Sequence, residues 1–340
     1  MKVAVFGAGY WAAFQVAAWQ ALNVEVVAVW NRTKSKALDF AQKFNIPKVF
    51  DTPEQIFEWG QFDIADIIAD VDAHEPLVML AVAHRKAVIC QKPMSGTYES
   101  CKRMVKVCSD AGVWYAIHEN FRYQPSIIAF KKVLASGVMG KLTRANIAMR
   151  SPDRAILSVQ PALTVMPHMV LRDMGPHIFD VARALFGEMH SIFAMPINTY
   201  PEYYVPDAAY CTLRTVSGMA LHCDLVHNWN DRIYVEGELG SITLTLDNVI
   251  KIVAGDKMEF IDTKNWPILD YIPKEDWDIH GGHVFNSIPN CLIDLRDSFL
   301  SGKPAPTSGE DNLKTMELVF AAIESFDTEK NIVLDERVWG

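Results

Sequence analysis

The feature that most constrains the fold is a glycine turn that joins a strand to a helix at the start of the chain. The apolar run Lys2–Phe6 predicts a short buried strand, the sequence GAGYWA follows it at residues 7–12, and a helix is predicted over Trp11–Leu22. A strand that passes through such a turn into a helix is typical of the first βαβ unit of a parallel α/β sheet.

The same alternation of strand and helix continues through the first third of the chain. The predicted strands are Val24–Trp30, Lys48–Phe50, Asp63–Ala69, Ala87–Ile89 and Trp114–Ile117, and the predicted helices are Lys34–Phe44, Pro76–Arg85 and Glu99–Ala111. This order predicts an α/β fold whose N-terminal part, residues 1–123, is a Rossmann domain with a parallel sheet.

After residue 123 the pattern changes to consecutive strands with alternating apolar and polar residues, two of them joined by a hairpin turn at Thr215–Gly218. The predicted strands are Leu142–Met149, Ala208–Thr215, Met219–Val226, Arg232–Glu236, Ser241–Leu246 and Val249–Val253. Helices are predicted at Ile127–Ser136, Gly175–Phe186, His283–Leu300 and Gly309–Ser325, the second and third of which are expected to cover one sheet face. Strands without crossover helices favour antiparallel pairing. Residues 124–340 are therefore predicted to form an α+β domain with a large, mostly antiparallel open sheet.

Charge and composition argue against several classes of function. The net charge of the 340 residues is −9 and no cluster of Lys and Arg stands out, which argues against nucleic acid and against an anionic membrane surface. No apolar run approaches the ~20 residues of a membrane span. The chain opens directly on a predicted strand, and its six cysteines are scattered without a CxxC pair. We therefore expect a cytoplasmic protein with reduced thiols.

The glycine turn itself indicates a dinucleotide site. Gly7 permits the tight turn, Gly9 lets the backbone approach a pyrophosphate, and Ala12 allows close packing of helix on strand. The first helical residues, Tyr10 and Trp11, bring N–H donors towards the anion. The alternative is a glycine turn in an α/β protein that binds no nucleotide.

The end of the second strand bears on which nicotinamide cofactor is bound. NAD sites usually place an acidic residue here, but this chain has Asn31 and Arg32. A guanidinium matches the geometry of a 2′-phosphate, so Arg32 favours NADP. NAD remains the alternative, with Asn31 bonding the ribose and Arg32 exposed on the surface.

Two further segments carry candidate catalytic residues. Lys92 follows a buried strand in the sequence CQKP, at the end of the strand where open α/β sheets bind ligands, and Pro93 favours an extended Lys92. In the second segment Asp173 and His177 are four residues apart, so a helix that begins here places them side by side, with Asp180 one turn further along. A histidine beside a carboxylate is a plausible general base. The alternatives are a solvated lysine, an N-cap role for Asp173, and a core position for His177.

Taken together, these motifs resemble the Gfo/Idh/MocA family of nicotinamide-dependent sugar oxidoreductases over essentially the whole chain. The landmarks are GAGYWA at 7–12, QKP at 91–93, ENFRY at 119–123, DMGPHIFD at 173–180 and SGEDNLKTMELVFAAIES at 308–325. The resemblance implies that Lys92, Asp173 and His177 form the catalytic group. It also implies cofactor contacts from Gln91 and Lys92 and substrate contacts from Asn120 and Arg122. Gln91 departs from the family pattern, which usually has Glu before the lysine.

The resemblance further implies oxidation of a sugar or polyol hydroxyl with hydride transfer to NAD or NADP. The segments CQKP, HENFRYQP and GEDNLKT are particularly similar to those of D-apiose dehydrogenases, which oxidise a branched pentose. The second domain is expected to bind the substrate and to form a homo-oligomer, either a dimer or a tetramer. Whether His177 or Lys92 is the base stays open. Two other functions also stay open, a glycosidase that retains NAD and a non-catalytic sugar sensor, whereas a metal site is not expected.

Overall fold

The chain folds into two units in the computed structural model, which describes residues 1–150, 161–200, 203–226, 232–264 and 282–334. The first unit contains Met1–Asn120 and takes up Phe285–Met316 from much later in the chain. The second contains Phe121–Ile268 and Glu317–Gly340. The first unit therefore contains a late segment that the sequence pattern assigned to the second domain.

The first unit is built on a six-stranded parallel sheet with the strand order β3-β2-β1-β4-β5-β6. Its strands are β1 (Lys2–Phe6), β2 (Glu25–Trp30), β3 (Lys48–Val49), β4 (Ile64–Ile67), β5 (Ala87–Gln91) and β6 (Tyr115–His118). The central strands are buried along almost their whole length, as expected for a sheet covered on both faces. The predicted parallel Rossmann sheet is confirmed.

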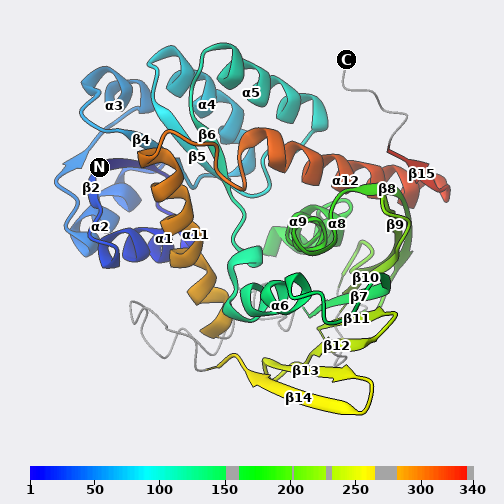
Figure 1. Ribbon diagram of the computed structural model, residues 1–340. Coiled ribbons are helices and arrows are strands. Elements are labelled where there is room, and N and C mark those ends of the chain that lie inside the picture. The colour runs from blue at the N-terminus through cyan, green and yellow to red at the C-terminus, as the bar shows by residue number, and fades with distance from the viewer. Residues whose placement is uncertain (151–160, 201–202, 227–231, 265–281, 335–340) are drawn as a thin grey trace. The chain divides into compact units, whose positions relative to one another are not determined.

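Helices cover both faces of this sheet (Figure 1). They are α1 (Tyr10–Ala21), α2 (Lys34–Phe44), α3 (Pro53–Trp59), α4 (His74–Ala83), α5 (Tyr98–Asp110), α11 (Gly282–Leu300) and the start of α12 (Gly309–Thr328), with a 3₁₀ turn η1 at Val71–Ala73. The short helix α3 is absent from the sequence-based prediction. It is capped by Thr52, whose hydroxyl accepts a hydrogen bond from the backbone N–H of Gln55, and it opens with Pro53.

The second unit is built on a nine-stranded sheet with the order β14-β13-β12-β11-β7-β10-β9-β8-β15. Its strands are β7 (Leu142–Arg150), β8 (Met189–Ile197), β9 (Ala208–Thr215), β10 (Ala220–Val226), β11 (Ile233–Gly237), β12 (Gly240–Leu244), β13 (Val249–Ala254), β14 (Lys257–Asp262) and β15 (Ile332–Val333). The pair β7–β10 is parallel and the other neighbouring pairs among these strands are antiparallel. The predicted mostly antiparallel sheet and the turn between β9 and β10 are confirmed, whereas β8, β14 and β15 are additional.

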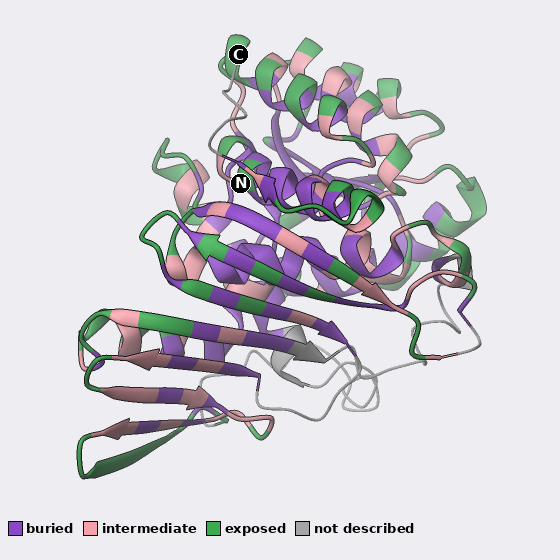
Figure 2. Ribbon diagram, turned by 90° about the vertical axis from the view of Figure 1, so that its right-hand side faces the viewer, coloured by how far each residue is buried: buried purple, intermediate pink, exposed green. Residues whose placement is uncertain are grey.

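One face of this sheet forms the core of the second unit. Buried and exposed residues alternate along β9 and β10 (Figure 2), and the buried ones pack against helices. These helices are α6 (Pro125–Ala135), α9 (Gly175–Phe186) and the later part of α12, accompanied by α8 (Met169–Asp173) and the 3₁₀ turns η2 (Phe121–Tyr123) and η3 (Pro161–Val165). The prediction that His283–Leu300 covers this sheet is wrong, because most of α11, from Phe285 to Leu300, groups with the first unit.

The described residues contain no helix that combines the length and apolarity needed to cross a membrane. All six cysteines are free thiols and buried.

Candidate active site

The glycine turn after β1 has two glycines that are required for different reasons. Gly7 has a φ of +123°, and a Cβ there would lie 2.1 Å from the carbonyl oxygen of Ile68, so no other residue fits. A Cβ on Gly9 would meet nothing within 4 Å. Packing inside the protein therefore demands glycine at position 7, whereas at position 9 glycine leaves open space above the turn.

Helix α1 begins directly after this turn, with Gly9 as its N-cap residue. No side chain among the described residues caps this end, and its first turn carries no acidic residue. The rings of Tyr10 and Trp11 lie edge to face at 5.2 Å between centroids. The turn thus presents a helix N-terminus beside open space, an arrangement that fits the pyrophosphate of a dinucleotide.

Asn31 and Arg32, at the end of β2, have different partners. Asn31 Oδ1 accepts a hydrogen bond of 3.1 Å from the backbone N–H of Ala8 and so ties the glycine turn to the next strand. Arg32 lies 3.0 Å from the carboxylate of Asp70, and both side chains are mostly exposed. An exposed pair of this kind contributes about 0–1 kcal/mol, so little holds Arg32 against a competing anion.

Lys92 lies on the same edge of the sheet as the glycine turn. The carboxyl ends of parallel strands meet at one edge, and β1 and β5 are separated only by β4. With strands about 4.8 Å apart, the ends of β1 and β5, which the glycine turn and Lys92 follow, are therefore separated by roughly 10 Å across the sheet. Ligands of open α/β sheets bind at this edge, where the strand order reverses.

A buried histidine holds the segment that follows Lys92. His74 Nδ1 lies 3.2 Å from the carbonyl oxygens of both Pro93 and Met94, and its Nε2 lies 3.1 Å from the carbonyl of Ala69. The ring thus connects the loop after β4 with the loop after β5. Burial lowers the pKa of His74 below its ordinary value.

Near this edge lies a carboxyl group that the sequence analysis did not include among the candidate site residues. Asp66, in the middle of β4, is fully buried, and it accepts hydrogen bonds of 2.7 Å from Gln15 Nε2 and from Trp19 Nε1. Gln15 and Trp19 are four residues apart on α1, so the same helix face carries both donors. Burial raises the pKa of Asp66 to about 7.

Gln91 connects this buried group to Lys92. Its Nε2 donates to Gln15 Oε1 at 3.0 Å, and its Oε1 accepts from the backbone N–H of Lys92 at 2.9 Å. The Nδ1 atom of His118, on the neighbouring strand β6, lies 3.4 Å from the same Nε2. A charged residue inside the apolar run Ile64–Ile68 is the one sign of this network that the sequence offers.

Asp173 and His177 lie on two helices rather than at the start of one. Asp173 is the last residue of α8, Met174 is the N-cap of α9, and His177 is the third residue of α9. Pro176 has no N–H for the carbonyl of Arg172, which accounts for the break. Since Met174 is the cap, the N-cap alternative for Asp173 is wrong. The buried His177 ring stacks on Phe121, with centroids 3.7 Å apart and planes 6° from parallel.

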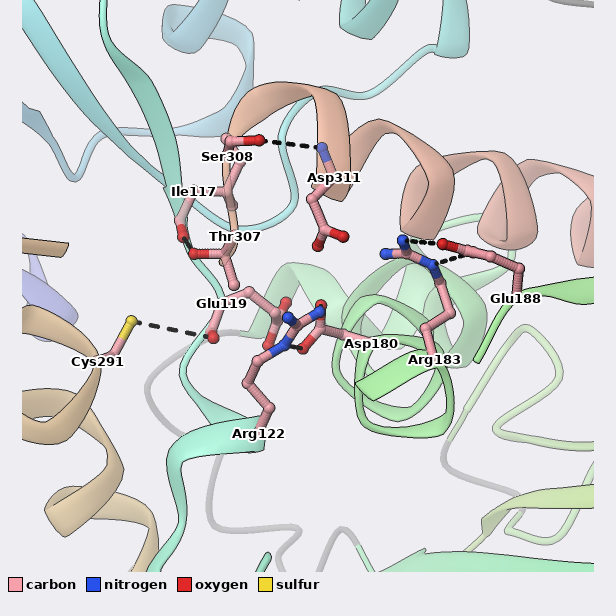
Figure 3. A network of polar contacts seen from close by, with 10 residues as sticks. All are labelled: Ile117, Glu119, Arg122, Asp180, Arg183, Glu188, Cys291, Thr307, Ser308 and Asp311. Carbon is pink, nitrogen blue, oxygen red and sulfur yellow. Dashed lines mark hydrogen bonds and ion pairs between the residues drawn. The ribbon is translucent and has the colours of Figure 1, made fainter. Parts of the chain in front are cut away.

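The two predicted substrate residues both have partners within their own units. Asn120 Nδ2 donates a 2.5 Å hydrogen bond to Ser287 Oγ. The guanidinium of Arg122 forms a bidentate ion pair with the fully buried Asp180 (Figure 3), in which Nε donates to Oδ2 at 2.6 Å. Asp180 therefore orients Arg122. Among the described residues, no group of three or more His, Cys, Asp or Glu side chains could hold a metal ion.

Two family models match successive parts of the chain. Residues 1–119 match the family model of the oxidoreductase family with an NAD-binding Rossmann fold, and residues 127–243 match that of the GFO/IDH/MocA C-terminal domain. The D-apiose dehydrogenase of Rhizobium rhizogenes is 29% identical over 96% of this chain and 95% of its own length. The myo-inositol 2-dehydrogenase of Thermotoga maritima is 23% identical over 99% of both chains.

Solved structures share this fold. An oxidoreductase from Agrobacterium radiobacter, in complex with NAD+, L-tartaric acid and magnesium, has a TM-score of 0.93 and 28% identity over 99% of both chains. A levoglucosan dehydrogenase in complex with NADH and levoglucosan shares the fold, with a TM-score of 0.79 and 18% identity. The glycine turn, the parallel sheet and the two matched models together show that this chain belongs to the Gfo/Idh/MocA family of NAD-binding oxidoreductases.

Proposed function

We propose that the protein oxidises a hydroxyl group of a sugar or polyol and transfers the hydride to a nicotinamide cofactor. The observation that carries this proposal is the placement of Lys92 on the same sheet edge as the glycine turn, about two strand spacings away. That spacing suits a lysine that acts beside the far end of a bound dinucleotide. The likeness to sugar and polyol dehydrogenases supports the substrate class.

The catalytic group in this proposal consists of Lys92, Asp173 and His177. His177 accepts the proton of the reacting hydroxyl, with its ring plane fixed by stacking on Phe121. Asp173 orients the substrate and the imidazole, and the Lys92 ammonium donates a hydrogen bond to the reacting oxygen. When bound, the nicotinamide supplies the hydride acceptor. A cyclic aldose would be oxidised to a lactone.

The cofactor is proposed to bind through the backbone of residues 7–11, with Asn31 on the ribose and Gln91 near the nicotinamide end. NADP is the proposed preference, because Arg32 can exchange its exposed pair with Asp70 for a 2′-phosphate. Replacing Arg32→Ala should weaken NADP binding about tenfold relative to NAD. The matched variant Asp70→Asn should strengthen NADP binding, because it frees Arg32 and removes a like charge. Equal changes for both cofactors in calorimetry would rule out this role of Arg32.

A branched pentose such as D-apiose is the proposed substrate. The support is the 29% identity to two D-apiose dehydrogenases together with the segments CQKP, HENFRYQP and GEDNLKT. Asn120 and Arg122 belong to the second of these segments and are proposed to contact the sugar.

A substrate screen tests the proposal. Pentoses including D-apiose, hexoses, inositols and sugar acids are incubated with the protein, with NAD and NADP in parallel, and reduced cofactor is followed by its absorbance. We expect release of reduced cofactor with at least one sugar or polyol and the highest kcat/KM with D-apiose. Binding of a sugar and cofactor without any reduced cofactor in solution would refute the dehydrogenase and favour a glycosidase that retains NAD.

A further inference from the structure

The hydrogen bonds that link Lys92 to Asp66 all run in one direction, which the backbone N–H of Lys92 imposes because it can only donate. At one end, both oxygens of the Asp66 carboxyl accept, one from Gln15 Nε2 and the other from Trp19 Nε1, so Gln15 turns its NH₂ group towards the carboxyl. At the other end, the backbone N–H of Lys92 only donates, so Gln91 must turn its carbonyl oxygen towards it. The middle link is then a donation from Gln91 Nε2 to Gln15 Oε1, which is the contact observed at 3.0 Å.

This direction explains the glutamine at position 91. Gln91 Nε2 has two hydrogens, one for Gln15 Oε1 and one for the Nδ1 atom of His118 at 3.4 Å. A glutamate at this position, the residue usual in the family, has no donor for either contact and would place oxygen against oxygen at Gln15. The amide of Gln91 is therefore the donor that the carbonyl oxygen of Gln15 requires.

The chain of hydrogen bonds also connects two parts of the proposed site. Gln15 lies on α1, the helix whose N-terminus faces the glycine turn, and Trp19 on the same helix fixes Asp66 from the other side. Gln15, Trp19 and Asp66 are almost fully buried, so water does not compete for these bonds. The position of the Lys92 backbone is thereby tied to that of α1.

We propose that Asp66, Gln15 and Gln91 are positioning residues that hold Lys92 in a fixed place relative to helix α1 through hydrogen bonds of a single direction. The inference rests on the proposed function, in which Lys92 acts on the substrate while the first turn of α1 binds the cofactor. None of the three residues touches the substrate, and their effect passes through Lys92.

A swap of the carboxylate and the amide tests this proposal. Asp66→Asn alone leaves an NH₂ group facing a donor, either Gln15 or Trp19, because the new amide has one acceptor oxygen. Gln15→Glu alone brings two carboxylates together. In the double variant Asp66→Asn/Gln15→Glu every link can form again: position 66 now donates to position 15, while the donations from Trp19 and from Gln91 keep their direction. The net charge is unchanged. The double variant also keeps the buried volume, so it is expected to fold.

Two measurements follow the effect on Lys92. Hydrogen exchange of the Lys92 amide reports on its hydrogen bond to Gln91 in the absence of substrate. The value of kcat reports on the position of Lys92 during turnover. We expect each single variant to exchange this amide about tenfold faster and to lower kcat about tenfold. The double variant should return both quantities to within about twofold of the wild type, while the dissociation constant for NAD stays unchanged.

Trp19→Phe is the matched control, because it also removes one hydrogen bond from Asp66 but lies outside the path to Lys92. It should lower the melting temperature without a change in Lys92 exchange or in kcat. The proposal is overturned if the double variant is no better than the worse single variant, or if exchange changes while kcat does not. If the wild type oxidises no sugar, the proposed function fails, and amide exchange alone then decides whether the chain of bonds holds Lys92.

Discussion

Asp66 should make the stability of the protein depend on pH in a way that one substitution abolishes. Burial raises the pKa of this carboxyl from 3.8 to about 7 in the folded state. The folded protein therefore holds this proton more tightly than the unfolded chain, and the contribution of Asp66 to stability is largest below about pH 4. It falls as the pH rises from about 4 to about 7 and then levels off. With roughly 1.4 kcal/mol for each pKa unit, the whole loss is about 4 kcal/mol.

About 2 kcal/mol of this loss falls between pH 5.5 and pH 8.5, a range accessible to experiment. Asp66→Asn removes the titrating group. The unfavourable contact between the new NH₂ group and a neighbouring donor lowers the stability of this variant by the same amount at every pH. The neighbours Gln15 and Trp19 do not titrate, and burial holds the pKa of the adjacent Cys90 thiol well above its ordinary value, so the thiol stays neutral in this range. The difference in stability between wild type and variant therefore reports Asp66 alone.

The measurement is denaturant unfolding of both proteins without cofactor, followed by circular dichroism at several pH values from 5.5 to 8.5. The wild type should lose about 2 kcal/mol relative to Asp66→Asn across this range. Parallel pH profiles for the two proteins would show that Asp66 does not titrate here, and the raised pKa would be wrong.

Three other predictions concern catalysis, the cofactor and assembly. Lys92→Ala and His177→Asn should each lower kcat by ~100-fold or more with little change in NAD affinity, whereas a loss of melting temperature with normal kcat would indicate a purely structural role. Gly9→Ala should fold normally but bind NAD at least about tenfold more weakly in calorimetry, while Gly7→Ala should lower the melting temperature because its Cβ would lie 2.1 Å from a carbonyl oxygen. The second unit should form a dimer or tetramer, since Tyr210 is exposed beside Met195 on the neighbouring strand, and a monomer mass by light scattering would contradict this.

The sequence predicts those elements whose signals are local. The glycine turn, the valine-rich strands and the alternation along β9 and β10 each determine their structure within a few residues, and the corresponding predictions are confirmed. Strand β14 is exposed along its whole length and therefore lacks the alternation that reveals a half-buried strand. Helix α11 has an amphipathic pattern that shows a buried face but not which sheet it meets.

The candidate site shows the same limit. Gly7, Gly9 and Lys92 stand out from the sequence because motifs surround them. Gln15 and Asp66 do not, because their significance lies in a contact between residues 51 positions apart. An isolated carboxyl in a buried strand signals that a partner exists, but it does not identify that partner.

The return of residues 285–316 to the first unit has a consequence for the order of folding. Ala116 forms a bridge with Ser308, and Thr307 donates to the carbonyl of Ile117, so this late segment covers the outer edge of β6. The two partners of the second contact are 190 residues apart. At a synthesis rate of about 5–20 residues per second, β6 leaves the ribosome roughly 10–40 s before the segment that covers its edge. During that interval the bare edge of β6 can pair with another chain, so we expect aggregation to be favoured during synthesis, before the late segment has bound.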